Sequence, residues 1–144
     1  SYTALGALPS LFFAASGIMQ IVAGFLVDRF GARRILLLGL TLLSLSVAGF
    51  GLVSEFWMLF PLAVLAGIGN SVFHPADLAI LTAKVSPPRL GRGYAIHALA
   101  GNVGWAAAPI GVISITQWAD WRTALIVSGL TGLGIVASLM LSVD

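Results

Sequence analysis

Two histidines and an aspartate are the side chains in this sequence best suited to carrying a proton through an apolar environment. His74 and Asp77 lie in a stretch that is otherwise apolar, and His97 follows after a short basic segment. On a helix, Asn70, His74 and Asp77 fall within roughly 40° of one direction. Imidazole changes its charge near physiological pH, so this pattern predicts proton transfer or binding of a small polar ligand.

Each of these residues also has a purely structural interpretation. Asp77 precedes Lys84 closely enough to reach the end of its helix, and His97 lies where an imidazole can simply pack. Two further polar residues in apolar stretches could line a pathway or form hydrogen bonds between helices. These two residues are Gln20 and Asn102.

The composition argues against several other kinds of chemistry. The chain has no cysteine, so we expect no disulfide, thiolate zinc site or catalytic thiol. The two histidines lack metal-binding spacing, and we expect no metal and no cofactor. A nucleophile elbow and a phosphate-binding glycine loop are absent from the sequence, so we expect no enzymatic activity. Seven Lys and Arg are too few for a nucleic-acid interface.

Membrane-spanning helices are the elements that must position these residues. The chain is 59% hydrophobic and only 8% charged, with a mean hydropathy of +1.05, whereas soluble domains carry about 25% charged residues. A spanning helix needs about 20 predominantly apolar residues, and hydrocarbon leaves the backbone no other partner. We predict an all-α, polytopic membrane helix bundle in one domain, residues 1–144, with five transmembrane helices at residues 3–27, 35–53, 56–83, 94–117 and 124–143.

Proline and glycine predict where these helices bend or pack closely. Pro75 has no N–H, so we expect a kink near the carbonyl of Ser71. Small residues at four-residue spacing let helix backbones approach one another. The positions where we expect a kink or close packing are Gly67, Pro75, Gly101, Gly104 and Pro109.

The basic residues orient the bundle. Short connections force neighbouring helices to run antiparallel, so successive loops alternate between the two sides. The loops at residues 28–34 and 84–93 hold six of the seven Lys and Arg, and the opposite side holds only Arg122. The positive-inside rule therefore predicts that both basic loops are cytoplasmic.

Residues 24–34 read Gly-Phe-Leu-Val-Asp-Arg-Phe-Gly-Ala-Arg-Arg. This stretch resembles the signature loop of the major facilitator superfamily, G-x-L-x-D-R-x-G-R/K-R/K-R/K, with Ala32 at the first basic position of the trailing cluster. A glycine at residue 31 can take the positive φ that a tight reversal needs. The resemblance implies a gating loop that stabilises one access state and contains Gly24, Asp28, Arg29, Gly31, Arg33 and Arg34.

The resemblance also implies an architecture and a set of partners. The five segments correspond to helices two to six, a partial N-terminal half of a twelve-helix transporter. The missing initiator Met fits a parent protein that adds a first helix and a C-terminal half. The implied partners are the lipid bilayer, a small-molecule substrate and the proton as coupling ion, in a bacterial plasma (inner) membrane.

A narrower resemblance links Ser-Val-Phe-His-Pro at residues 71–75 and Gly-Asn-Val-Gly at residues 101–104 to the fosmidomycin-resistance branch of drug-efflux carriers. The chain departs from that pattern with Ala76 and Ala79, and Ala63 replaces an arginine of many proton-coupled relatives. The resemblance implies alternating access and proton-coupled efflux of an organic anion or drug by an antiporter. The competing expectation is a truncated or accessory membrane protein with a structural role and no transport of its own.

Overall fold

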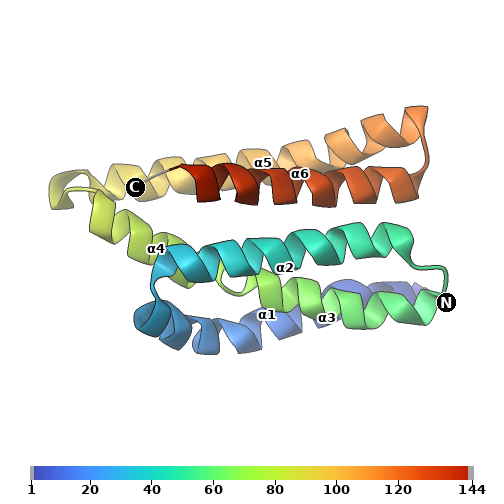
Figure 1. Cartoon of the computed structure of the whole chain (residues 1–144), viewed down its shortest axis with the longest axis horizontal. Helices are drawn as coiled ribbons and strands as arrows, with labels where there is room; N and C mark the ends of the chain where they lie inside the picture. The colour runs from blue at the N-terminus through green and yellow to red at the C-terminus, as the bar shows by residue number, and fades with distance from the viewer. Residues whose placement is uncertain (1, 143–144) are drawn as a thin grey trace.

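The computed structural model describes residues 2–142, which form six α-helices and two short 3₁₀ turns without any strand (Figure 1). The fold class is therefore all-α, as the sequence predicts. The 3₁₀ turns are η1 (Phe56–Met58), before α3, and η2 (Pro87–Arg89), before α5. The α-helices are α1 (Tyr2–Phe30), α2 (Ala32–Leu52), α3 (Leu59–Asn70), α4 (Phe73–Lys84), α5 (Leu90–Trp118) and α6 (Trp121–Leu141).

Five stretches within residues 2–142 are long and apolar enough to cross a membrane, which agrees with the predicted number of spans. Large apolar side chains such as Phe25, Trp105 and Leu141 remain exposed on the outside of the bundle. A bilayer is the solvent that suits such a surface, because every backbone group inside a helix is already paired. The stretches are Thr3–Phe30, Ala32–Leu52, Phe56–Lys84, Pro87–Trp118 and Trp121–Leu141.

The connections are shorter than the hydropathy pattern indicates. α1 continues to Phe30 and α2 begins at Ala32, so the expected loop at residues 28–34 is reduced to Gly31. Gly31 has a φ of 89°, a value that costs glycine little because it has no Cβ, and the chain reverses there. Of the expected loop at residues 84–93, only residues 85–86 and η2 separate α4 from α5. The expected last helix ends at Val143, which lies outside the described residues.

The single helix expected over residues 56–83 is divided into α3 and α4. Ser71 and Val72 form a turn between them, and Pro75 has no N–H to donate to the Ser71 carbonyl. Ser71 bonds back into α3: its amide donates to the carbonyl of Gly67 at 3.0 Å and its hydroxyl to that of Ile68 at 2.6 Å. The span therefore consists of two helical rods that meet at this turn.

Glycines allow the closest contacts between helices. A Cβ added to Gly69 of α3 would lie 2.8 Å from the carbonyl oxygen of Gly39 on α2, and one added to Gly39 would lie 2.7 Å from the Gly69 carbonyl. Gly67, one of the predicted packing positions, faces the backbone carbonyl of Phe12 on α1 in the same way. α3 is therefore wedged between α1 and α2 by direct backbone approach.

The antiparallel helices α2 and α6 form another close pair (Figure 1). A Cβ added to Gly129 of α6 would lie 2.6 Å from the carbonyl oxygen of Ser44 on α2. Arg33, in the first turn of α2, donates from Nη2 to the carbonyls of Leu139, at 2.8 Å, and Ser142, at 2.7 Å. These carbonyls belong to the end of α6, where a helix leaves acceptors unpaired and favours a cation.

Arg122 does the same at the opposite end of this helix pair. From the first turn of α6, its Nη1 donates to the carbonyls of Gly51, at 3.2 Å, and Val53, at 2.5 Å, at the end of α2. Its guanidinium also lies over the ring of Trp121, 4.7 Å from the centroid. Arg122, the one basic residue that the sequence places on the opposite side from the other six, therefore binds the end of α2.

Asp120 begins α6 as its N-cap. Its Oδ1 accepts a hydrogen bond from the backbone N–H of Thr123 at 2.6 Å. This bond holds the pKa of the Asp120 carboxyl below its ordinary value of 3.8, because it favours the charged form. The cap fixes the start of α6 beside Arg122.

α5 is the least covered helix of the bundle. It lies beside α6, on the opposite side of α2 from α1 and α3 (Figure 1). Every residue from 95 to 111 is exposed. Its place in the fold is therefore set by α6 and by a short contact with α4.

Candidate functional site

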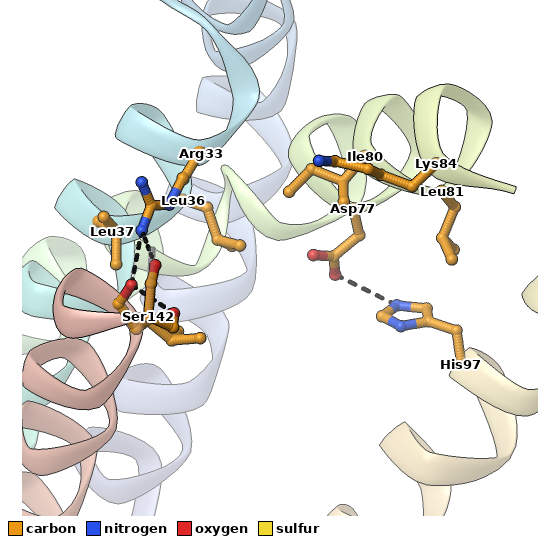
Figure 2. A pocket seen from close by; sticks show the side chains of 10 residues that line it. Arg33, Leu36, Leu37, Asp77, Ile80, Leu81, Lys84, His97 and Ser142 are labelled. Carbon is orange, nitrogen blue, oxygen red and sulfur yellow. Dashed lines mark hydrogen bonds and ion pairs between the residues drawn. The ribbon is translucent and has the colours of Figure 1, made fainter. Parts of the chain in front are cut away.

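Asp77 of α4 and His97 of α5 lie face to face across the hairpin that joins these helices. Oδ2 of Asp77 is 3.2 Å from Nε2 of His97 (Figure 2). The Asp77 side chain is 20% exposed and that of His97 is 49% exposed, so the carboxylate is the more enclosed of the two. The sequence marked both residues as candidates but did not indicate that they pair.

The pair borders a cavity of about 430 Å³ where α2, α4, α5 and α6 meet (Figure 2). Arg33 and Lys84 also line it, so two basic side chains border the same cavity as the carboxylate and the imidazole. This arrangement can exchange a proton and attract an anionic group, while the apolar part of the wall accommodates a hydrocarbon body. The remaining lining residues are Leu36, Leu37, Ile80, Leu81, Leu139 and Ser142.

The predicted polar stripe is divided by the turn between α3 and α4. Asn70 donates from Nδ2 to Oγ of Ser16 on α1 at 3.0 Å, which is a hydrogen bond between packed helices. His74 is exposed, and within residues 2–142 it forms no hydrogen bond or ion pair. Of the three residues in the stripe, the structure brings only Asp77 to the cavity.

Gln20 and Asn102 lie apart from this cavity. Gln20 is half-buried on α1, and Asn102 is exposed on α5. The expected close packing at Gly101 and Gly104 is not present among the described residues, because a Cβ at either position would meet no atom within 4 Å. Pro109 is contained within α5, which continues through it to Trp118.

The signature-loop residues divide into one that contacts another helix and several that do not. Arg33 reaches the end of α6. In the described part of the chain, Asp28 and Arg34 are exposed and form no hydrogen bond or ion pair. Arg29 lies over the ring of Phe30 at 5.4 Å. A Cβ at Gly24 would meet no atom within 4 Å, so this glycine makes no close helix contact within residues 2–142.

A comparison with protein families identifies the chain. The Major Facilitator Superfamily model matches residues 1–144, the whole sequence. The chain belongs to the major facilitator superfamily. Membership agrees with the five apolar spans of the structure.

The curated relatives of this protein include transporters and a sensor. A probable L-galactonate transporter of Escherichia coli K12 is 31% identical over 133 residues, which is 92% of this chain and 29% of that protein. The membrane sensor protein UhpC of Salmonella typhimurium LT2 is 28% identical over 131 residues, 91% of this chain and 30% of that protein. The multidrug resistance protein MdtH of Shigella boydii is 27% identical over 86 residues, 60% of this chain. The chain thus spans about 30% of the length of the first two.

Three residues at or next to this site were not identified as functional candidates from the sequence. Lys84 was counted only as a topological charge, although its distance from Asp77 along the helix could have placed both at one cavity. Tyr94 and Thr82 form a contact between α4 and α5, with their hydroxyl oxygens 2.9 Å apart. The position of Tyr94 one helical turn before His97 is the signal that could have drawn attention to it.

Proposed function

We propose that this superfamily member is part of a proton-driven secondary transporter that moves a small molecule by alternating access. The observation that most strongly supports this proposal is the Asp77–His97 pair, which joins two helices beside a cavity. The parent protein would add a first helix and a C-terminal half, a proposal supported by the share of its relatives that the chain spans. The substrate would then bind between the two halves.

The proposed proton carrier is the pair itself. A carboxylate within a membrane-spanning segment is costly unless it is paired or faces a cavity, and Asp77 does both. Its attraction to His97 depends on the charge of the imidazole, which is the side chain that ordinarily titrates near physiological pH. Proton binding therefore changes the force that holds α5 on α4, and this links protonation to helix position.

The proposed substrate is a small organic anion or drug. Arg33 and Lys84 give the cavity a surplus of permanent positive charge, and this supports an anionic group on the substrate. The relative named as a probable L-galactonate transporter supports an organic anion, and the relative named as a multidrug resistance protein supports a drug. Export by antiport, as in the fosmidomycin-resistance branch, remains a prediction about direction.

The proposed orientation places Gly31 and η2 on the cytoplasmic side of a bacterial inner membrane. Six of the seven Lys and Arg lie near this end of the bundle, in agreement with the positive-inside rule. A gating role for the signature loop and roles for Gln20, His74 and Asn102 in the pathway remain predictions. Impermeant labelling of a cysteine placed at residue 86, with one at residue 54 as its counterpart, tests this orientation.

The test of transport uses the protein encoded by the complete open reading frame, purified and reconstituted in phospholipid liposomes. We expect flux of a labelled organic anion to respond to an imposed pH gradient, and we expect Asp77→Asn to remove that response. Glu55→Gln provides a carboxylate control outside the cavity. Flux in the Asp77→Asn protein that follows the pH gradient as in the parent would exclude the proposed proton carrier.

A sensor or accessory role is the second candidate, supported by the relative named as a membrane sensor protein. A sensor would bind its ligand without net flux. Binding of the same labelled anion in detergent, combined with an absence of flux in liposomes, would favour this role over transport.

A further inference from the structure

The hydroxyl groups of Tyr94 and Thr82 form a second link between α4 and α5. Thr82 Oγ1 donates to the carbonyl of Leu78 at 2.7 Å, and it lies 2.9 Å from the Tyr94 hydroxyl. A threonine hydroxyl has only one hydrogen to donate. Tyr94 must therefore be the donor to Thr82, and the chain of bonds ends on the backbone of α4.

Few other contacts set the position of this part of α5. A Cβ built on Gly93 would lie 3.5 Å from the side chain of Val85 and 3.9 Å from that of Leu81, which is ordinary van der Waals contact. Beyond this point, residues 95–111 are exposed. The two hydroxyls are thus the polar contact between α4 and α5 nearest to the turn, and the Asp77–His97 pair follows one helical turn later.

His97 lies one turn beyond Tyr94 on the same face of α5. The rotation and height of α5 that Tyr94 sets therefore also decide whether Nε2 of His97 reaches Asp77, at its observed 3.2 Å. A small rotation of α5 about its own axis would carry the imidazole away from the carboxylate.

We propose that Tyr94 is a positioning residue for the Asp77–His97 pair, acting through Thr82 to hold α5 at the rotation in which the two groups meet. Its link to transport rests on the proposed function, whereas the geometric claim does not. A hydroxyl–hydroxyl bond is unaffected by the charge of an imidazole. When His97 loses its proton, α5 is therefore still attached to α4 at Tyr94 and pivots there.

Other charged and titratable groups face the pair and belong in the design of the test. Arg33 of α2 and Lys84 of α4 line the same cavity, and His74 lies one turn before Asp77 on α4. The end of α6 adds Leu139 to the cavity, and Ser142 follows directly after the helix; neither side chain titrates. The pH measurements should therefore be repeated with His74→Gln, so that a response from that imidazole is not assigned to His97.

Spin labels on the two helices test the geometric claim in the complete protein. The chain has no native cysteine, so Leu78→Cys on α4 and Ala100→Cys on α5 would be the only label sites within it. Both residues are exposed. We expect a narrow distance distribution at a pH where imidazole is protonated and a broader one above that range. Tyr94→Phe should give the broad distance distribution at both pH values.

Matched variants separate positioning from general damage. Thr82→Val should reproduce Tyr94→Phe, and the double variant should add nothing to either, because one chain of bonds is removed. Thr131→Val is the control, since the Thr131 hydroxyl bonds only the Val127 carbonyl of its own helix, at 2.8 Å. A Tyr94→Phe protein whose distances and pH response match those of the parent would overturn the proposal. If Tyr94→Phe fails to fold, Thr82→Val decides in its place.

Transport provides the readout that a merely structural residue would not change. Loss of positioning removes an anion from beside His97. Tyr94→Phe and Thr82→Val should therefore both move the pH midpoint of transport, whereas Thr131→Val should leave it in place. Distances that respond to Tyr94→Phe without any proton-driven flux would refute the proposed function alone. A flux midpoint unmoved by both Tyr94→Phe and Thr82→Val would refute the positioning role alone.

Discussion

Arg33 and Arg122 lie at opposite ends of the α2–α6 pair, and each donates two hydrogen bonds to the carbonyl end of the other helix. Each arginine therefore provides the donors for one end of the helix pair, although their sequence contexts differ. One belongs to the signature loop and the other is isolated on the opposite side. Together with the glycine contacts between α2 and α6, they hold these two helices against each other at both ends and along their length.

Replacing Arg122 should destabilise the bundle because two carbonyls at the end of α2 lose their donor. We expect Arg122→Ala to cost about 1.5–3 kcal/mol, the range for hydrogen bonds to charged groups. Arg122→Lys should recover only part of this, because an ammonium cannot reproduce the planar fork. Thermal unfolding in detergent, followed by loss of helical circular dichroism, measures both. Equal midpoints for Arg122→Ala and the parent would contradict the assigned role.

Arg33 should matter more for stability than its neighbour Arg34. Arg33→Gln removes the donor to Leu139 and Ser142, whereas Arg34 forms no hydrogen bond or ion pair with the described residues. Because Arg33 is exposed, we expect a loss below about 1 kcal/mol, and Arg34→Gln should have no measurable effect. The two variants have the same change in charge, so a difference between their unfolding midpoints reports the contacts that Arg33 makes and Arg34 does not.

The crossing of α2 and α3 should tolerate no side chain at Gly69. An added Cβ would lie 2.7 Å from the backbone N of Leu43 and 2.8 Å from the Gly39 carbonyl oxygen, and backbone cannot move aside cheaply. We expect Gly69→Ala to cost about 1–3 kcal/mol through overpacking. Gly104→Ala, where the space is open, should instead be neutral or slightly stabilising because alanine favours helix. Unfolding midpoints compare the two directly.

Acid should weaken the start of α6 through Asp120. The Thr123 hydrogen bond holds the pKa of this carboxyl below 3.8 in the folded state, so its stabilisation is complete above that pH. The stabilisation is lost as the pH falls through the lower pKa of the folded state. Asp120→Asn keeps an N-cap without titrating, so its unfolding midpoint should change less with acid than that of the parent. Parallel acid dependence of the two proteins would argue against the cap.

Asp77→Asn and His97→Gln should uncouple flux from protons without removing the cavity. We expect proton-driven accumulation to fall by about tenfold or more, while exchange of labelled for unlabelled substrate continues, because neither change fills or opens the cavity. His74→Gln should have a smaller effect, since His74 does not line the cavity. Accumulation and exchange in liposomes, measured on the same preparations, separate coupling from substrate binding. A His74→Gln defect larger than that of Asp77→Asn would move the proton carrier to His74.

Local properties of the chain were enough to predict most of the architecture. The five spans follow from hydropathy, since any long apolar run in a bilayer must be helical. The turn at Gly31 and the interruption before Pro75 follow from the backbone freedom of glycine and the missing N–H of proline. The lengths of the connections did not follow, because a charged residue such as Arg29 can continue a helix beyond the apolar run that hydropathy detects.

The contacts between helices required the folded structure. Helical periodicity places His74 and Asp77 on one face, yet it gives neither a partner, and His97 meets Asp77 only because the turn after Lys84 folds α5 back beside α4. The sequence likewise marks Arg33 as a gating-loop residue and Arg122 as a topological charge, and only the register of α2 against α6 brings each to a helix end. Hydropathy and charge are properties of single segments. A pair of side chains depends on the crossing and register of two helices, and these are set by the packing of the whole bundle.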